Sequence, residues 1–422
     1  MTRSMSRRRQ WRVGAVLTVA AFIAGPTTAW ASGTSPVRAA STKATRTGTI
    51  NFGAIVSQSG LFGGTGPQFL DGLQLAVAQL NRSGGIVVGN TRYKVVLQLR
   101  DDRSDASASA AAATQLVDQL GVKFIFGPTN SIGAPAVAQL VVPQGVIMLT
   151  PATAVAAKLT PALAKSTNRT LFLTGVGLGE YAATIRTGIS GAYPKAKRVA
   201  IIAPQDATGQ TVIPLIQEGI RDAGMTVVDT ETVSDNSTDY SAALTNIKNS
   251  RPDVLMTCCS APVVQGEIAQ AVQLGAAPAF LAYDVPFGSA LSATGSTLQL
   301  PFADIGYPGL LAKLPGGQVI GARPGEANFV LQMKKVLHRT VTDDTYALYF
   351  YDEVFMLAKA IEEAHSTANT TAIAHDLATM HYTGGALGEL SFLSVHSIQT
   401  KYDLCTALRG TVKCRVLNHQ KG

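Results

Sequence analysis

A chain of 422 residues is too long for one ordinary core, so two or three domains are expected. Its composition, 46% hydrophobic and 15% charged, is typical of a well-packed globular protein and excludes intrinsic disorder for most of the chain. The formal charge is +8, but residues 1–31 carry five arginines and no acid, which leaves +3 for the rest. So small a surplus predicts no nucleic-acid partner.

Residues 1–31 have the pattern of an export signal. Arginines precede an apolar run over 13–24 that is too short to span a bilayer, and Ala29 and Ala31 are the small residues that a signal peptidase reads. The alternative is an uncleaved membrane anchor, and the export route, Sec or twin-arginine, stays open. No lipobox cysteine follows, and residues 32–48 form a predicted Ser/Thr/Ala linker. We expect a protein exported to the periplasm or the cell surface.

Strand and helix patterns then alternate in two series. Strands are predicted over 49–57, 93–99, 123–126 and 146–149, then over 199–203, 226–228, 253–257 and 279–282, with helices between them. Helices follow over 328–338, 346–364 and 371–380, and a short β segment comes last. This alternation predicts an α/β fold of two doubly wound parallel-sheet lobes, whose strand ends meet at a crevice suited to a ligand.

Two of these strands run directly into small hydroxyl residues that open helices. The first leads to Thr129 and Ser131, and the second leads to Thr150 and Thr153. Backbone N–H groups at a helix start lack an intrahelical partner and carry the positive end of the peptide dipoles. Two such openings side by side make a seat for a carboxylate. The pattern therefore predicts recognition of a small acid without any catalytic group.

An ordered set of short motifs resembles the leucine/isoleucine/valine-binding proteins, the branched-chain amino-acid branch of the type I periplasmic solute-binding proteins. The matching stretches are 55–60 with Gly66, 71–86, 99–102, 127–131, 150–153, 159–160 and 349–362. Each motif is weak alone, but together they cover nearly all of 49–416.

The resemblance implies a Venus-flytrap fold in which the chain crosses between lobes three times, near Gly175, Gly309 and Phe392. Lobe 1 is then 49–174 plus 310–391, and lobe 2 is 175–309 plus 392–422. The three crossings act as a hinge on which the lobes close around a ligand, and a membrane permease recognises the closed shape.

The resemblance also assigns ligand contacts in lobe 1. Ser131, which follows Asn130, matches a serine that binds the ligand's α-carboxylate; the alternative role is a helix N-cap. The loop that includes Thr150 and Ala152 matches one that binds carboxylate and ammonium. Its register is shifted, because the family's threonine falls at Ala154 and the nearest hydroxyl is that of Thr153.

Two further contacts come from elsewhere in the chain. Asp284 aligns with an acidic residue of lobe 2 that neutralises the ligand's ammonium; the alternative is an ordinary turn aspartate. Tyr351 matches an aromatic residue that lines the crevice from a late helix; the alternative is a core position.

The chain departs from the family where aromatic walls are usual. Thr65, Thr208 and Ser260 or Ala261 occupy those positions. Hydroxyls there forfeit part of the roughly 1.5–3 kcal/mol that burial of a leucine side chain contributes. Either Phe62 and Phe287 replace the missing wall, or the ligand is larger or more polar than leucine. We expect an amino acid or small carboxylate other than leucine.

The cysteines predict one disulfide. Cys405 and Cys414 are equidistant from a turn between two short predicted strands, so a cross-strand bridge is expected. Cys258 and Cys259 follow a buried strand without a C-x-x-C pattern or a basic neighbour, which favours plain packing or partial exposure over a redox role.

The sequence offers no case for an enzyme. Asp101, Asp102 and Asp105 are typical of residues that open a helix rather than of a cation site, and the six histidines all lie after residue 337 without ligand spacing. No catalytic or nucleotide-binding motif occurs. We therefore predict no catalytic residue, metal or cofactor. A hydrolase on the same scaffold is the least favoured alternative.

The expected function is that of a monomeric solute-binding protein that delivers its ligand to the permease subunits of an ABC importer. The alternative, from another class of function, is a ligand sensor whose closed form is recognised by a membrane signalling partner.

Overall fold

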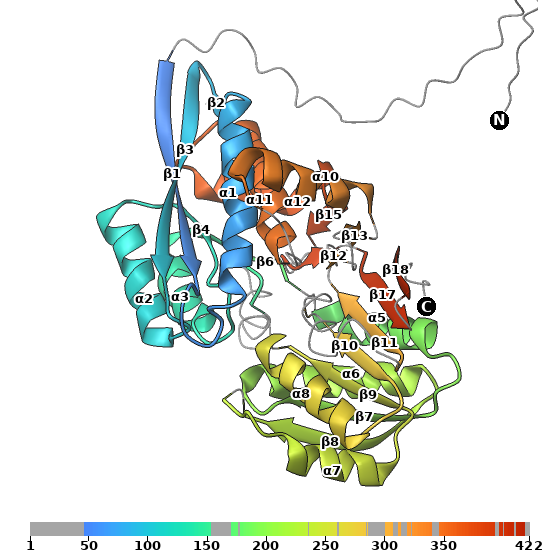
Figure 1. Ribbon diagram of the computed structural model, residues 1–422. Coiled ribbons are helices and arrows are strands. Elements are labelled where there is room, and N and C mark those ends of the chain that lie inside the picture. The colour runs from blue at the N-terminus through green and yellow to red at the C-terminus, as the bar shows by residue number, and fades with distance from the viewer. Residues whose placement is uncertain are drawn as a thin grey trace, which may run out of the picture. The chain divides into compact units, whose positions relative to one another are not determined.

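The computed structural model describes residues 46–152, 170–175, 178–234, 236–259, 261–283, 285, 300–306, 311–313, 319–321, 323–339, 346–392, 396–399, 401–408 and 411–417. Within these ranges strands and helices alternate as the sequence predicts (Figure 1). The predicted export signal, the linker up to residue 45, Thr153, Asp284 and the crossing expected at Gly309 lie outside the described residues.

The first sheet runs in the order β2-β3-β1-β4-β5-β6. Its strands are β1 (Arg46–Val56), β2 (Ile86–Val88), β3 (Thr91–Asp101), β4 (Phe124–Phe126), β5 (Ile147–Thr150) and β6 (Leu171–Leu173). β2 pairs antiparallel with β3, and the other neighbours pair in parallel. Every residue of β4 and β5 is buried, because helices cover both faces of the sheet.

The alternating side chains of β1 pack against different helices on the two faces. Ile55 shares a buried cluster with residues of α2 (Ala106–Thr114), of the π-turn that continues it (Gln115–Gln119) and of α3 (Ala134–Val141). Phe52 belongs to a second cluster with α1 (Gly66–Arg82) and α11 (Ala347–Glu363). Because the side chains of a strand alternate between its two faces, neighbouring residues at the strand's end also point to opposite faces of the sheet.

The first long helix, α1, shows why the local pattern forms a helix here. A proline stands in its first turn, and Phe69, Leu73 and Leu80 bury one face at helical spacing. It ends where Gly84 and Gly85 take φ values of +115° and +78°, a left-handed conformation that favours glycine.

The second sheet runs in the order β18-β17-β11-β10-β9-β7-β8. Its strands are β7 (Arg198–Pro204), β8 (Thr226–Val233), β9 (Val254–Cys258), β10 (Phe280–Tyr283), β11 (Phe302–Gly306), β17 (Asp403–Leu408) and β18 (Thr411–Val416). The strands from β8 to β11 are parallel, and β17 and β18 join antiparallel at the edge. The accompanying helices are α5 (Leu178–Ala192), α6 (Ala207–Asp222), α7 (Ser241–Ser250) and α8 (Ala261–Leu274).

The late part of the chain is mostly helical, as expected after residue 325. It contains α10 (Pro324–Gln332), which continues as a π-turn (Met333–Leu337), then α11 and α12 (Thr370–Thr379). The short strands are β12 (Leu311–Lys313) with β13 (Val319–Gly321), and β14 (His381–Gly385) with β15 (Gly388–Phe392) and β16 (Ile398–Gln399).

The connections between the two sheets bear on the expected hinge. Gly175 lies between β6 of the first sheet and α5, which packs against α6 beside the second sheet. β16 still pairs with β15, and Ser397 bridges to Leu173 of β6. We therefore propose a third crossing after Gln399 in place of the one expected near Phe392. No helix within the described ranges is both long and apolar enough to cross a membrane.

Candidate functional site

A buried carboxylate ties together three strand ends of the first sheet. Asp102, at the end of β3, accepts hydrogen bonds from the Ser57 hydroxyl after β1 (2.8 Å) and from the Asn130 side-chain amide after β4 (2.8 Å). The Ser104 backbone N–H (2.9 Å) and the Ser109 hydroxyl (3.2 Å) complete its surroundings. With no measurable exposure, Asp102 depends on these donors for the solvation that water would otherwise supply.

Asn130 also shapes the loop that opens α3. Its Oδ1 accepts from the backbone N–H groups of Ile132 and Gly133, both at 2.9 Å. The amide of the same side chain also donates to the Ser57 hydroxyl at 2.8 Å. The side chain that caps this turn is therefore that of Asn130, whereas Ser131 lies on the wall of a cavity.

This cavity, of about 90 Å³, has the carboxyl ends of strands from both sheets on its walls. The first lobe contributes Phe62, Thr65, Phe69, Thr129, Asn130, Ser131, Ile132, Pro151, Ala152, Tyr346 and Tyr349, and the second contributes Tyr181, Asp206, Thr208, Val212 and Cys259.

One wall of the cavity is aromatic. The ring of Phe69 on α1 stacks on that of Tyr346 at 4.9 Å between centroids and meets Tyr349 edge-on at 5.6 Å. Phe62 lies on the same cavity. Thr65 and Thr208, which stand where the family usually has aromatic residues, line the cavity as well.

Tyr351 is not among the lining residues, contrary to the sequence prediction. Its hydroxyl donates to Gln79 at 2.6 Å, and its ring packs edge-on against Phe329 at 5.1 Å. Two residues along a helix rotate a side chain by about 200°. Because Tyr346 and Tyr349 face the cavity from α11, Tyr351 has to face away from it.

The second lobe presents a carboxylate at the start of α6. Asp206 Oδ1 accepts from the backbone N–H groups of Thr208 (2.8 Å) and Gly209 (3.0 Å), so this aspartate caps the helix. Asp206 is half-buried and lies on the cavity wall. It is the acidic side chain among the described lining residues and brings a negative charge to the cavity wall. Asp284, from which such a charge was expected, lies outside the described residues.

Of the residues at the end of β5 that were expected to contact the ligand, Thr150 and Ala152 lie differently. The Thr150 hydroxyl is buried, donates to the carbonyl of Pro128 (2.8 Å) and accepts from the N–H of Ala152 (3.2 Å). Thr150 therefore shapes the loop without lining the cavity, whereas Ala152 lines it.

Comparisons with known proteins identify the family. A family model described as "Periplasmic binding protein" matches residues 49–407. The chain belongs to the periplasmic binding proteins. The Leu/Ile/Val-binding protein BraC3 of Rhizobium johnstonii is 31% identical over 206 residues, which are 49% of this chain and 53% of that relative. The chain thus spans about half the length of the curated relatives it matches, and the resemblance to the Leu/Ile/Val-binding branch is confirmed.

Solved structures confirm the type I fold. The branched-chain amino-acid substrate-binding protein LivJ of Streptococcus pneumoniae, in complex with isoleucine, has a TM-score of 0.70 at 22% identity and covers 87% of this chain and 99% of its own. A solute-binding protein of an ABC transporter from R. palustris, in complex with benzoate, has a TM-score of 0.72 at 15% identity and covers 88% and 97%.

Several lining residues of this periplasmic binding protein escape the sequence patterns, among them Asp206, Tyr346, Tyr349 and Cys259. Asp206 comes two residues after β7 and could have been noticed as a helix-opening acid. The same signal was used for Asp105, which caps α2 by accepting from the Ala108 N–H at 2.8 Å. Tyr346 and Tyr349 share one helix face at i, i+3. Cys259 gave no signal beyond its place after a strand.

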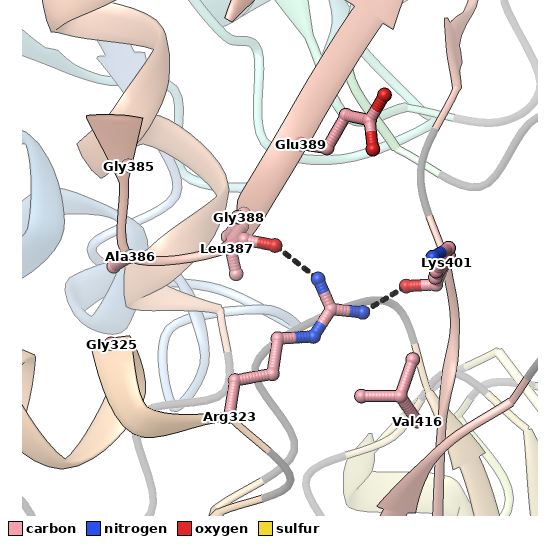
Figure 2. A pocket seen from close by; sticks show the side chains of 9 residues that line it. All are labelled: Arg323, Gly325, Gly385, Ala386, Leu387, Gly388, Glu389, Lys401 and Val416. Atoms are coloured by element: carbon pink, nitrogen blue, oxygen red, sulfur yellow. Dashed lines mark hydrogen bonds between the residues drawn. The ribbon is translucent and has the colours of Figure 1, made fainter. Parts of the chain in front are cut away.

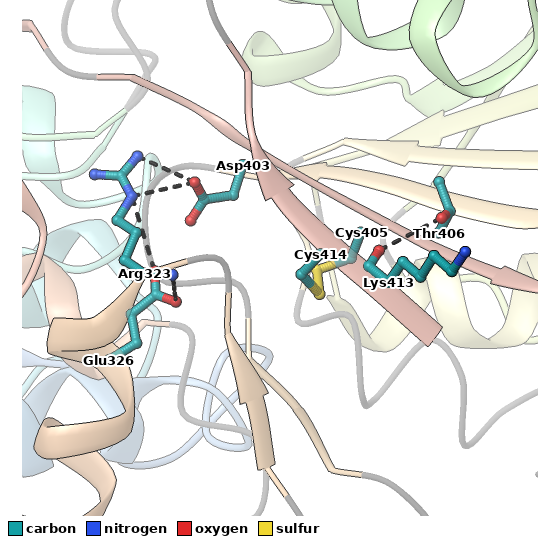
Figure 3. Close-up of a disulfide and its surroundings, with 7 residues drawn as sticks. All are labelled: Arg323, Glu326, Asp403, Cys405, Thr406, Lys413 and Cys414. Carbon is teal, nitrogen blue, oxygen red and sulfur yellow. Dashed lines mark hydrogen bonds and ion pairs between the residues drawn. A yellow bond between two sulfur atoms is a disulfide. The ribbon is translucent and has the colours of Figure 1, made fainter. Parts of the chain in front are cut away.

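Both cysteine pairs are joined in this periplasmic binding protein. Cys405 on β17 and Cys414 on β18 are bonded across the hairpin, as expected (Figure 3). Cys258 and Cys259 are also bonded to each other. The sequence did not predict this second bond; Cys258 is buried, Cys259 is half-buried, and the backbone at Cys259 has a φ of +86°.

A larger hollow of about 400 Å³ shares no lining residue with the strand-end cavity. Figure 2 shows the residues that line it. Its guanidinium, that of Arg323, already donates to Asp403 at 3.1 and 3.2 Å and to the carbonyls of Leu387 and Lys401. The remaining charges on its wall, Glu389 and Lys401, are exposed. Because its buried cation is already neutralised, we do not assign the ligand here. Within the described residues no group of three or more His, Cys, Asp or Glu side chains is placed to hold a metal.

Beside this hollow, Arg323 stands between two buried acids, Glu326 and Asp403 (Figure 3). Burial, and next the charge of Asp403, raise the pKa of Glu326 from its ordinary 4.5 to about 9. Glu326 is therefore protonated at neutral pH, and one cation faces one charged acid.

We expect Glu326→Gln to flatten the pH dependence of unfolding. The folded-state pKa is raised, so the stability that the protonated group confers is complete below pH 4.5 and is lost as the pH rises toward about 9. Denaturant titrations from pH 5 to 9 should show that the free energy of unfolding of the variant rises relative to that of the wild type by roughly one kcal/mol per pH unit. The exposed Glu363→Gln, which alters an i,i+4 pair with Lys359, is the control and should follow the wild type. Parallel profiles for Glu326→Gln and the wild type would contradict the assignment.

Proposed function

We propose that this chain is the extracytoplasmic solute-binding subunit of an ABC importer, and that it binds an amino acid or related small carboxylate in the strand-end cavity and delivers it to a membrane permease. One observation carries the proposal. The cavity combines the helix-opening segment Thr129–Ile132 with an aromatic wall on one side and the carboxylate of Asp206 on the other.

The helix-opening segment supports a carboxylate seat. The network of Asp102 and Asn130 holds this loop in place before any ligand arrives, so little ordering entropy is lost on binding. The Ser131 side chain and the backbone of this segment lie at the positive end of α3, where an anion is stabilised.

The other walls of the cavity support an ammonium and an apolar group. Asp206 uses one oxygen to cap α6 and brings a negative charge to the cavity, while Asp284 remains a second predicted partner outside the described residues. The aromatic wall suits an apolar or aromatic side group. The structurally similar protein from S. pneumoniae was solved with isoleucine and the one from R. palustris with benzoate. Both an amino acid and an aromatic carboxylate are therefore candidate ligands.

Delivery follows from the hinge that the sequence predicts between the lobes. A ligand that touches Ser131 on one side and Asp206 on the other favours the closed arrangement, since it gains both sets of contacts only there. Periplasmic binding proteins are exported, and a permease that recognises the closed form would receive the ligand unchanged.

Ser131→Ala is expected to weaken binding without weakening the fold. Loss of a hydrogen bond to a charged carboxylate should raise the Kd about tenfold or more. Calorimetry against L-leucine, L-phenylalanine, benzoate and 4-hydroxybenzoate would identify a binding compound and then measure this change. The unfolding midpoint of the empty variant should match the wild type, and the exposed helix position Ser190→Ala should change neither quantity. An unchanged Kd would remove Ser131 from the site, and failure of every small carboxylate to bind the wild type would refute the proposed function.

A further inference from the structure

The bonded pair Cys258–Cys259 lies where the second sheet reaches the cavity. Cys258 ends β9, is buried and pairs in register with Tyr283 of the neighbouring strand β10. Cys259 follows it, is half-buried and lines the cavity. The disulfide thus stands at the carboxyl end of a parallel strand, the place where open α/β sheets present their ligand contacts.

The backbone at this point is held in an unusual conformation. Cys259 has a φ of +86°, and it is the non-glycine residue with a positive φ among the described residues that line the cavity. For a residue with a Cβ, such a conformation costs on the order of 1–3 kcal/mol and persists where the surroundings enforce it, which is typical of binding sites. The bond to the adjacent cysteine closes a small ring that enforces this turn.

The neighbours of the disulfide make this side of the cavity apolar. Tyr181 and Val212 line the cavity from the same lobe, and the ring of Tyr181 packs against that of Tyr283 at 4.4 Å. A disulfide presents polarizable sulfur and, unlike a thiol, has no S–H to donate. Asp206 and Thr208 supply the polar groups nearby, so charge and apolar contact come from separate parts of one wall.

We propose that the Cys258–Cys259 disulfide is a specificity-determining surface of this cavity, in contact with an apolar or aromatic side group of the bound carboxylate. The inference rests on the proposed function. It adds that the intact sulfur–sulfur bond sets both the shape of the wall and the class of side group that fits against it. Reduction or removal of the bond is then a loss of ligand contact rather than a loss of fold.

The test compares Cys258→Ala/Cys259→Ala with Cys405→Ala/Cys414→Ala, which removes the other disulfide and leaves the cavity untouched. Calorimetry would use whichever of L-leucine, L-phenylalanine and benzoate binds the oxidised wild type, with L-alanine as the probe that lacks a large side group. We expect the first variant to lose about tenfold in affinity for the larger probe and little for L-alanine, which lowers the selectivity ratio. The second variant should bind as the wild type does.

A reduction experiment covers the case in which the first variant does not fold. A water-soluble phosphine takes up the oxygen of one water molecule, and its two electrons and the two water protons convert the disulfide to two thiols. In the Cys405→Ala/Cys414→Ala background this step can act only on Cys258–Cys259, and thiol counting reports its completion. The affinity for the larger probe should again fall about tenfold. Equal affinity before and after reduction overturns the inference while leaving the proposed function intact, whereas absence of binding by the oxidised protein fails the proposed function itself.

Discussion

Asn130→Asp should lower the free energy of unfolding by roughly 3–5 kcal/mol at neutral pH and abolish ligand binding. The side-chain amide of Asn130 donates to Asp102 at 2.8 Å and to the Ser57 hydroxyl at 2.8 Å, and the residue is only 3% exposed. The substitution keeps the shape of the side chain but sets a second carboxylate oxygen against that of Asp102. The loop that carries Ser131 then loses the network that positions it. Denaturant titration and calorimetry measure the two effects.

A matched control separates burial from like-charge chemistry. Asn246 donates to Glu231 at 3.0 Å in the same amide-to-carboxylate arrangement, but it is exposed, so Asn246→Asp should cost under about 1 kcal/mol. The pH dependence supplies a second check. Beside a buried carboxylate, the pKa of the introduced carboxyl group rises, so the lost stability should partly return as the pH falls toward about 5. Similar small losses in both variants would show that the buried network does not hold the loop.

Gly72→Ala should destabilise the protein by roughly 3 kcal/mol, although alanine is the better helix former by about 1 kcal/mol. Gly72 lies on α1 where the helix packs against α11, and an added Cβ would overlap the carbonyl oxygen of Ala347. The obstacle is backbone, so the helices have to separate. Phe69 and Tyr346, which stack between these helices, would part with them and weaken the aromatic wall.

Gly64→Ala is the control for this prediction, because a Cβ there meets nothing within 4 Å. Its effect on the free energy of unfolding should stay within about 0.5 kcal/mol. Calorimetry on the folded fraction of Gly72→Ala should show weaker binding of any ligand with an aromatic or apolar group. Wild-type stability together with wild-type affinity would mean that α1 and α11 do not need this close approach.

The sequence located one half of the candidate site well. The strand-to-hydroxyl transition after β4 directs attention to Asn130 and Ser131, and both line the cavity. It divided their roles less well, since the side chain of Asn130, and not that of Ser131, accepts the backbone N–H groups of the turn before α3. Which hydrogen-bonding side chain caps a turn depends on its other partners, here Ser57 and Asp102, which come from different strands.

Two short strands of the fold could not be predicted from the local sequence pattern. β6 and β11 are three and five residues long and buried throughout, and neither is among the predicted strands. A short apolar run carries no period by which a strand differs from a buried loop or helix segment. Their pairing with β5 and β10 makes them strands, and that pairing is a property of the assembled sheet.

By itself the sequence determined the family, the alternation of strands and helices, and the strand ends at which a ligand would be held, because these follow from local periodicity and from motifs a few residues long. Only the tertiary structure decided which side chains meet. The cavity joins residues from Phe62 to Tyr349, and the packing of α11 against α1 sets the phase that turns Tyr346 and Tyr349 inward and Tyr351 outward. The same packing of distant segments placed Asp206 and the Cys258–Cys259 disulfide beside them.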